Sequence, residues 1–219
     1  MMRWIVILLF YSFTGTPPPA GGESNGHDLT VSYSIEVKSK KRNTGIGETY
    51  NGGVKTLFAS DRQLRLRLVS LMRMQSVLIF PDSSLSPKIV LLKESGKDKY
   101  KCYLTPGDWK LYNQKYEGVV CRITGDTARI LNYVCKKAVL TLKSGKYITV
   151  YYTPAIQKPA LARVEPLFSS IPGLVLKYEY TYRKGTVTYT ATMVSRSSID
   201  PDVFAIPGNE FPVKKFTGE

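Results

Sequence analysis

The residues that could carry chemistry are few in this chain, and their spacing fits no catalytic arrangement. The single histidine, His27, lies in a stretch of Gly, Ser, Asn and Asp, so triads that rely on a histidine base lack a well-placed base. No Cys-x-x-Cys pair, no metal-ligand spacing and no glycine-rich phosphate-binding motif occurs in the sequence. We therefore expect a protein that is not an enzyme, with no catalytic residue, no metal and no cofactor.

The seventeen Asp and Glu residues leave one catalytic alternative open. Many of them fall in predicted loops, as do Glu94 and Asp98. A glycosidase needs two carboxyl groups about 5 to 10 Å apart in space, at no fixed spacing in the sequence. Such a pair in a cleft would indicate an enzyme.

Three cysteines, Cys102, Cys121 and Cys135, allow one disulfide in an oxidising compartment and leave one thiol over. Cys102 and Cys121 lie in short predicted strands joined by residues 106–117, and we expect these two to pair. Closing that loop would stabilise the fold by about 3 kcal/mol in the chain-entropy account. A Cys121–Cys135 pair is one alternative, and three reduced thiols are another.

The elements that must position these side chains are predicted to be β-strands. Residues 29–37 alternate between apolar side chains such as Tyr33 and polar ones such as Ser34, which is typical of a strand with one dry face. Residues 63–69 repeat the pattern, with Leu64, Leu66 and Leu68 inward. Further strands are predicted over 54–60, 73–80, 89–92, 100–104, 118–123, two segments between 130 and 154, 174–183 and 186–194.

Helices are predicted to be minor. Thr105 can cap a single helical turn with Pro106 at its first position, and no long segment has a convincing helical period. The sequence therefore predicts a mainly β fold, with about ten antiparallel strands by the count of alternating segments. Its apolar content and its many Tyr, Val and Thr residues suit such a sheet.

The segment from 174 to 194 is predicted to be a β-hairpin. A two-residue turn at 184–185 places Tyr182 opposite Val187 and Tyr180 opposite Tyr189, so the apolar side chains of both strands share a face. A three-residue loop would divide them between the two faces, because a slip of one residue reverses every side chain.

The N-terminus is typical of a secretion signal. Arg3 supplies the positive start, an apolar run covers 4–10, and small residues and prolines follow up to Gly22. That run is shorter than the ~20 apolar residues that cross a bilayer. We expect a signal peptide over 1–22, a flexible lead-in over 23–28 and a single β-rich domain over 29–219. A buried N-terminal strand is the alternative.

Three motifs in the second half of the chain carry a family resemblance. They are Tyr133-Val134-Cys135-Lys136-Lys137-Ala138, Tyr151-Tyr152-Thr153-Pro154 with Ile156, and Ile171-Pro172-Gly173-Leu174-Val175-Leu176. They resemble the GLPGLI family of exported bacterial proteins, although Ser170 and Ile171 stand where that family has its first Gly-Leu. The resemblance implies export to the periplasm or the extracellular side of a Gram-negative-type envelope. It implies no biochemical function, because the family has no established activity.

The pattern Asp-Pro-x-x-Phe-x-Ile-Pro over 200–207 adds a resemblance at the level of the fold. It is similar to lipoprotein-carrier proteins, which form a strongly curved, half-open sheet. The resemblance therefore implies a half-open barrel, lipoprotein-carrier-like, and no function by itself.

Pro172 and Gly173 are predicted to have a structural role. Pro fixes φ and Gly permits a positive φ, which is the arrangement of a type II turn. The turn would aim the strand that follows, without any ligand.

The formal net charge of +14 indicates attraction to anionic partners such as envelope lipid or surface polysaccharide. The basic residues are spread along the chain, which is typical of solvated strand faces, and no specific nucleic acid is expected. A structural or interaction protein whose basic surface contacts anionic glycan or lipid headgroups is one functional alternative.

The function we expect first is binding of a hydrophobic small molecule or lipid on the concave face of the sheet. A ligand bound on an uncovered concave face would be stabilised by ~25 cal/mol for each Å² of apolar surface that binding removes from water. The alternative is that the same side chains form a closed core. The candidate ligand-binding residues are Leu176, Tyr178, Tyr180, Tyr182, Tyr147 and Tyr151.

Overall fold

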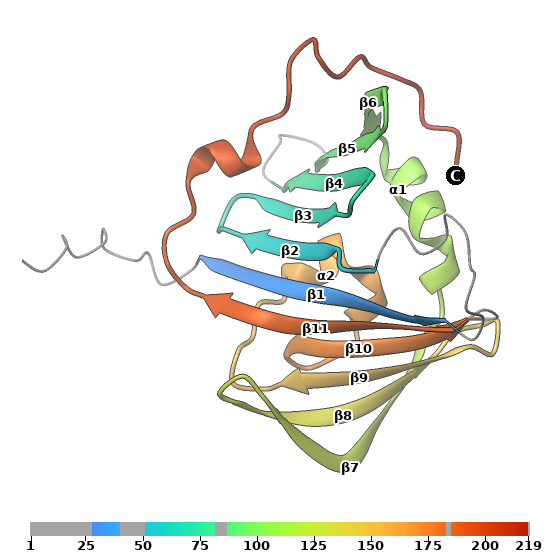
Figure 1. The fold of residues 1–219 in the computed structure, drawn as a ribbon, viewed down its shortest axis with the longest axis vertical. Coiled ribbons are helices and arrows are strands. Elements are labelled where there is room, and N and C mark those ends of the chain that lie inside the picture. The colour runs from blue at the N-terminus through green and yellow to red at the C-terminus, as the bar shows by residue number, and fades with distance from the viewer. Residues whose placement is uncertain (1–27, 40–50, 82–86, 183–184, 219) are drawn as a thin grey trace, which may run out of the picture.

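The computed structural model describes residues 28–39, 51–81, 87–182 and 185–218, which form one eleven-stranded antiparallel sheet with short helical segments (Figure 1). The strands are β1 (Leu29–Ser39), β2 (Val54–Ala59), β3 (Leu64–Val69), β4 (Arg73–Phe80), β5 (Lys88–Ser95), β6 (Asp98–Leu104), β7 (Val120–Ile130), β8 (Tyr133–Thr141), β9 (Tyr147–Thr153), β10 (Leu174–Tyr182) and β11 (Gly185–Ser195). The helical segments are α1 (Pro106–Asn113), η2 (Gln114–Tyr116), α2 (Leu161–Val164), η3 (Pro166–Phe168) and η4 (Pro201–Phe204). The predicted signal peptide and lead-in up to residue 27 lie outside the described residues.

The sheet is curved and open. Its order is β6-β5-β4-β3-β2-β1-β11-β10-β9-β8-β7, so β6 and β7 are the two edges and do not pair with each other (Figure 1). The predicted fold class, a mainly β, curved antiparallel sheet with minor helices, is confirmed.

The segment after β6 carries the chain from one edge of the sheet to the other. Thr105 caps α1 through a reciprocal capping box with Asp108, and Pro106 occupies the first helical position, as the sequence predicts. The helix then continues for two turns, longer than expected, and η2 follows before β7 begins. We call residues 105–119 the edge link.

The alternation read from the sequence sets the dry face of the sheet. In β1 the side chains of Val31, Tyr33 and Ile35 are buried, while Ser34 and Glu36 are exposed. The same period places Leu64 in the core. A strand with this pattern has only one face that can be dry, which fixes its orientation in the sheet.

The late hairpin has the predicted faces but a different register. Tyr180 lies opposite Val187 and Tyr178 opposite Tyr189, and Gly185 is already paired within β11, so the turn is not at 184–185 as predicted. The pairing of Tyr182 with Val187 is therefore wrong. The difference is two residues on one strand, and an even shift leaves every side chain on its face.

The turn before β10 is not the type II turn that the sequence predicts. The N–H of Gly173 donates to the carbonyl of Ile171 at 2.9 Å, which makes a three-residue turn centred on Pro172. A Cβ on Gly173 would lie 2.2 Å from the carbonyl oxygen of Thr153, so this close approach requires glycine.

The short segment formed by α2 and η3 packs against the inside of the curve. Its Val164 belongs to a core cluster with residues of β1 to β6 and of β8, β10 and β11, and its Leu167 belongs to a second cluster with residues of β8, β9 and β10. This segment, which we call the plug, therefore joins the two halves of the concave face.

The C-terminal residues run back over the β6 edge (Figure 1). Val213 forms a parallel bridge with Lys101, whose N–H donates to Pro212 at 3.0 Å. Phe204 and Phe211 are buried and hold this segment against the sheet. Arg65, which alternates with the inward leucines of β3, donates to the Val203 carbonyl and to Ser76 on the other face of the sheet.

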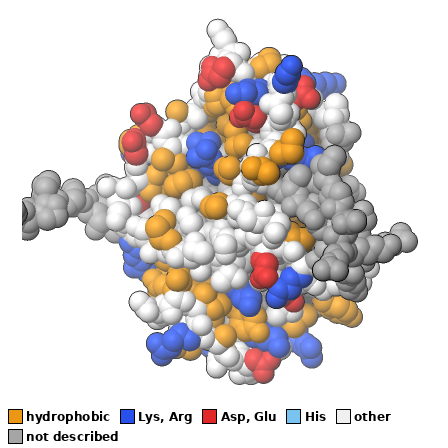
Figure 2. Space-filling view, viewed as in Figure 1, with side chains coloured by type: hydrophobic (Ala, Val, Ile, Leu, Met, Phe, Trp, Pro, Cys, Tyr) orange, Lys and Arg blue, Asp and Glu red, His pale blue; other side chains and the backbone are white. Residues whose placement is uncertain are grey.

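The basic side chains are scattered over the face drawn in Figure 2, where no single patch of Lys and Arg gathers. This matches the spread seen in the sequence. None of the helices in the described part of the chain has the length and apolar character needed to cross a membrane.

Candidate functional site

A cavity of about 670 Å³ lies inside the curve of the sheet. Its volume is typical of sites that enclose small organic ligands. It is bounded by β2 to β5 on one side, β9, β10 and β11 on the other, the plug, and the edge link. Its aromatic lining residues are Trp109, Tyr112, Tyr116, Tyr147, Tyr178, Tyr180 and Tyr189.

Three of the six predicted ligand-binding residues line this cavity. Tyr178 and Tyr180 form part of its wall, and Tyr147, which is 65% exposed, lies at its opening. Leu176 is fully buried in the core and does not reach it. Tyr151 packs elsewhere, with the ammonium of Lys177 6.0 Å from its ring centroid.

Tyr182, the sixth predicted residue, lies at the end of β10, and its side chain is outside the described part of the structure. The leucine stripe of β3 is present in the wall, since Leu66 and Leu68 line the cavity.

Stacked rings make up much of the wall. The rings of Tyr178 and Tyr189 stack with centroids 4.3 Å apart, and Tyr180 stacks on Tyr189 at 6.5 Å. Across the cavity, Trp109 and Tyr112 of α1 stack at 5.4 Å. Rings arranged in this way present flat apolar surface with hydroxyl groups at the ring tips.

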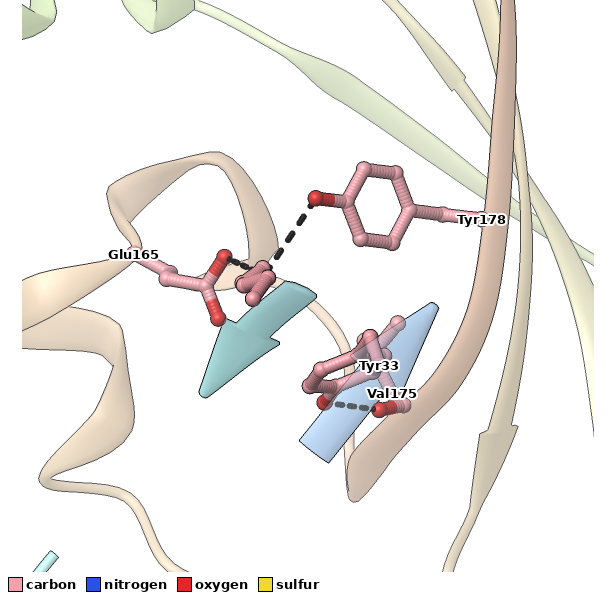
Figure 3. Close-up of polar contacts among 5 residues, drawn as sticks. Tyr33, Glu165, Val175 and Tyr178 are labelled. Atoms are coloured by element: carbon pink, nitrogen blue, oxygen red, sulfur yellow. Dashed lines mark hydrogen bonds and ion pairs between the residues drawn. The ribbon is translucent and has the colours of Figure 1, made fainter. Parts of the chain in front are cut away.

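A buried ion pair lies where the plug meets the cavity. Lys55 of β2 is 3% exposed, and its ammonium pairs with the carboxylate of Glu165, which precedes η3. The same ammonium donates to the Tyr178 hydroxyl at 3.3 Å. Figure 3 shows Glu165 and Tyr178 pointing toward this common position, with the Tyr33 hydroxyl donating to the Val175 carbonyl at 2.7 Å nearby.

Aromatic faces surround the Lys55 ammonium. Its Nζ atom lies 4.7 Å from the ring centroid of Tyr33, 4.8 Å from that of Tyr178 and 5.7 Å from that of Tyr189. Cation–π contact therefore adds to the ion pair in holding the charge.

Burial is the largest cause of the pKa shifts in this cluster. Desolvation lowers the pKa of Lys55, and the charge and hydrogen bond of Glu165 oppose that shift. Desolvation raises the pKa of Tyr33 and of Tyr178 well above the usual tyrosine value, and the negative charge of Glu165 adds to both shifts. The two hydroxyls therefore stay neutral, and that of Tyr33 donates to the Val175 carbonyl while that of Tyr178 accepts from the Lys55 ammonium.

The importance of Lys55 was missed in the sequence, although a signal was present. In β2, Lys55 has the same parity as Leu57 and Ala59, which are buried, so alternation assigns a lysine to the dry face. A buried lysine needs a partner, and the partner, Glu165, is 110 residues away in the chain.

A second cavity of about 360 Å³ lies on the other side of the plug. Pro172 and Gly173 line it, together with Tyr33 and Leu57. Glu165 borders both cavities, so the ion pair stands in the wall between them.

The described lining of these cavities lacks the carboxylate pair that the sequence left open as a catalytic alternative. Among the described lining residues Glu165 is the single carboxylate, so neither cavity holds a carboxylate pair of the glycosidase type. The described residues contain no cluster of three or more potential metal ligands.

The predicted disulfide is wrong. Cys102, Cys121 and Cys135 are all free thiols, and Cys102 and Cys121 lie in β6 and β7 at opposite edges of the sheet. Their strands do not pair with each other, because the edge link carries the chain from one edge of the sheet to the opposite edge. Burial raises the pKa of the Cys102 and Cys135 thiols.

Comparison with known proteins identifies no family. No family model matches the chain, and no curated protein matches it. Among solved structures, PNGF-II aligns with 86% of this chain at 18% identity and a TM-score of 0.47, and this chain spans 30% of the length of PNGF-II.

Two further solved structures are similar at a comparable level. An uncharacterized conserved protein from Thermus thermophilus aligns over 88% of this chain and 92% of its own, with 8% identity and a TM-score of 0.48. The Mycobacterium tuberculosis lipoprotein LppX aligns over 74% and 84%, with 12% identity and a TM-score of 0.30. Likeness at this level carries no argument about function.

Proposed function

We propose that the protein binds a small hydrophobic molecule or lipid in the main cavity and catalyses no reaction. The observation that carries the proposal is the aromatic-lined space of about 670 Å³ on the concave side of the sheet. Apolar walls with a few fixed polar groups are typical of small-molecule sites. Tyr178 and Lys55 would be such groups, since both are held by hydrogen bonds before any ligand arrives.

The proposal includes export to the cell envelope. Its support is the apolar run over 4–10 after Arg3, which belongs to the sequence outside the described residues. Mass spectrometry of the protein recovered from its own cells would give the N-terminus of the mature chain. A mature protein that retains residues 1–22 would contradict this part of the proposal.

Native mass spectrometry of the protein purified from its own cells tests the binding function. We expect a bound species that disappears on denaturation and is identified as a hydrophobic compound in the released fraction. A clean unliganded mass would count against the proposal.

A neutral fluorescent probe, N-phenyl-1-naphthylamine, provides the second test. We expect saturable binding that weakens in Tyr189→Ala, which removes a ring from the cavity wall. Met193→Ala, on the same strand but 44% exposed and not in the lining, is the matched control and should bind as the wild type does. Equal binding by both variants would place the probe elsewhere and refute the assignment.

A further inference from the structure

The main cavity has an unbalanced charge. Among the described lining residues, four are lysines and one is a glutamate, which gives 4 − 1 = +3. Lys55 and Glu165 neutralise each other in the buried ion pair. The excess therefore resides on the three other lysines, Lys93, Lys115 and Lys146.

These three lysines come from separate elements around the opening, and we call them the rim lysines. Lys93 is half-buried in β5, Lys115 is exposed in η2, and Lys146 is exposed in the turn between β8 and β9. None of them forms an ion pair with another described residue of the chain. Lys115 contacts a ring face instead, with its ammonium 5.0 Å from the centroid of Tyr116.

The lining is therefore divided by polarity. The stacked rings of Tyr178 and Tyr189 belong to the inner wall, where Tyr178 is buried. The uncompensated positive charge belongs to side chains that are partly or fully exposed. An apolar body with one anionic end matches both parts, because lysine ammonium groups bind carboxylate or phosphate as point charges.

We propose that the ligand of this cavity is an anionic amphiphile whose carboxylate or phosphate head group is held by the rim lysines while its apolar part lies against the tyrosine wall. This inference rests on the proposed binding function and specifies the ligand class. The head group could belong to a fatty acid or to a phosphate-bearing lipid, and both share the chemistry that the lysines recognise.

Competition against N-phenyl-1-naphthylamine with three ten-carbon probes tests the inference: decanoate, decyl phosphate and 1-decanol. An exposed charge contact changes affinity up to about fivefold, and three acting together give about 30-fold after allowance for non-additivity. We therefore expect the triple variant Lys93→Gln/Lys115→Gln/Lys146→Gln to weaken at least one anionic probe by about 30-fold. Binding of 1-decanol should change less than twofold.

The matched control carries the same loss of charge outside the cavity. Lys88, Lys97 and Lys136 are exposed and absent from the lining, so Lys88→Gln/Lys97→Gln/Lys136→Gln should leave both anionic probes within about twofold of wild type. The probe that is weakened more in the rim variant identifies the head group as carboxylate or phosphate. Raising the salt concentration should weaken the anionic probes in the wild type and have little effect in the rim variant.

The outcomes separate the two proposals. If the rim variant binds decanoate and decyl phosphate within twofold of wild type, or weakens 1-decanol equally, the ligand is not selected by its charge and the inference is overturned. If the naphthylamine probe and all three competitors fail to bind the wild-type protein, the binding function itself fails, and the inference fails with it.

Discussion

Removing the carboxylate of Glu165 should destabilise the protein strongly, because it leaves the Lys55 ammonium buried without a counter-ion. Lys55 is 3% exposed and the Glu165 side chain 16% exposed, so water cannot easily replace the lost partner. Breaking a buried pair by removing one member typically costs about 3–5 kcal/mol. We expect Glu165→Gln, which preserves shape, to lower the free energy of unfolding by an amount in this range at pH 7.

The loss of stability in Glu165→Gln should depend on pH, and its direction follows from the pKa of Lys55. Desolvation lowers the pKa of Lys55 and Glu165 raises it, so the pKa should fall further in Glu165→Gln. Between the lowered folded pKa and the unfolded value of about 10.5, the unfolded chain binds the extra proton, and stability rises with pH. The deficit of the variant should therefore shrink from pH 6 to pH 9.

Urea unfolding followed by circular dichroism measures these free energies. Measurements should stop at pH 9, because the raised pKa of Tyr33 and of Tyr178 means that their ionisation in the unfolded chain lowers stability above about pH 10. The double variant Lys55→Met/Glu165→Leu replaces the pair by apolar groups and should lie near the wild type.

The exposed pair between Lys137 and Asp126, at 2.9 Å, supplies a control. Asp126→Asn should have a much smaller effect than Glu165→Gln, since water screens that pair. A loss below about 0.5 kcal/mol in Glu165→Gln, a size usual for surface substitutions, would refute the reasoning. A double variant as unstable as the single would refute it equally.

Three further predictions concern packing and thiols. Gly173→Ala should cost about 1–3 kcal/mol in thermal unfolding, because its Cβ would meet Thr153, whereas Gly125→Ala, with open space around it, should change little. Leu176→Ala should cost about 2–5 kcal/mol, while Tyr147→Ala should leave stability within about 0.5 kcal/mol and weaken naphthylamine binding. Thiol titration of the denatured, unreduced protein should find three reactive thiols per chain. A count of one would indicate a disulfide between the other two cysteines and contradict the prediction.

Much of the fold could be predicted because its signals are local. The alternation around Tyr33 and Tyr189 needs only neighbouring residues, and it determines which face of each strand is dry. The capping residues Thr105 and Pro106 are local as well, and α1 begins where they indicate. Even the error in the hairpin register left the side chains on their faces, because the period of a strand is two.

The parts that failed depend on contacts between distant segments. Cys102 and Cys121 are close in sequence, but the edge link separates their strands by the whole width of the sheet, and no local pattern encodes that order. The candidate site depends on such long-range contacts as well, since Lys55 and Glu165 meet only where the plug packs against the sheet. Tyr178 was predicted from its face alone, and its contact with Lys55 was not.

The edge link has a mechanical consequence. It is the covalent tether between β6 and β7, and it also supplies Trp109, Tyr112 and Tyr116 to the cavity. Gln75 of β4 donates to the Tyr112 hydroxyl at 2.5 Å. The edge link is therefore hydrogen-bonded to β4 in addition to its covalent connections to β6 and β7. Any flattening of the sheet that widens the cavity must stretch or lift this tether, so the span between Leu104 and Val120 limits how far the two edges of the sheet can move apart.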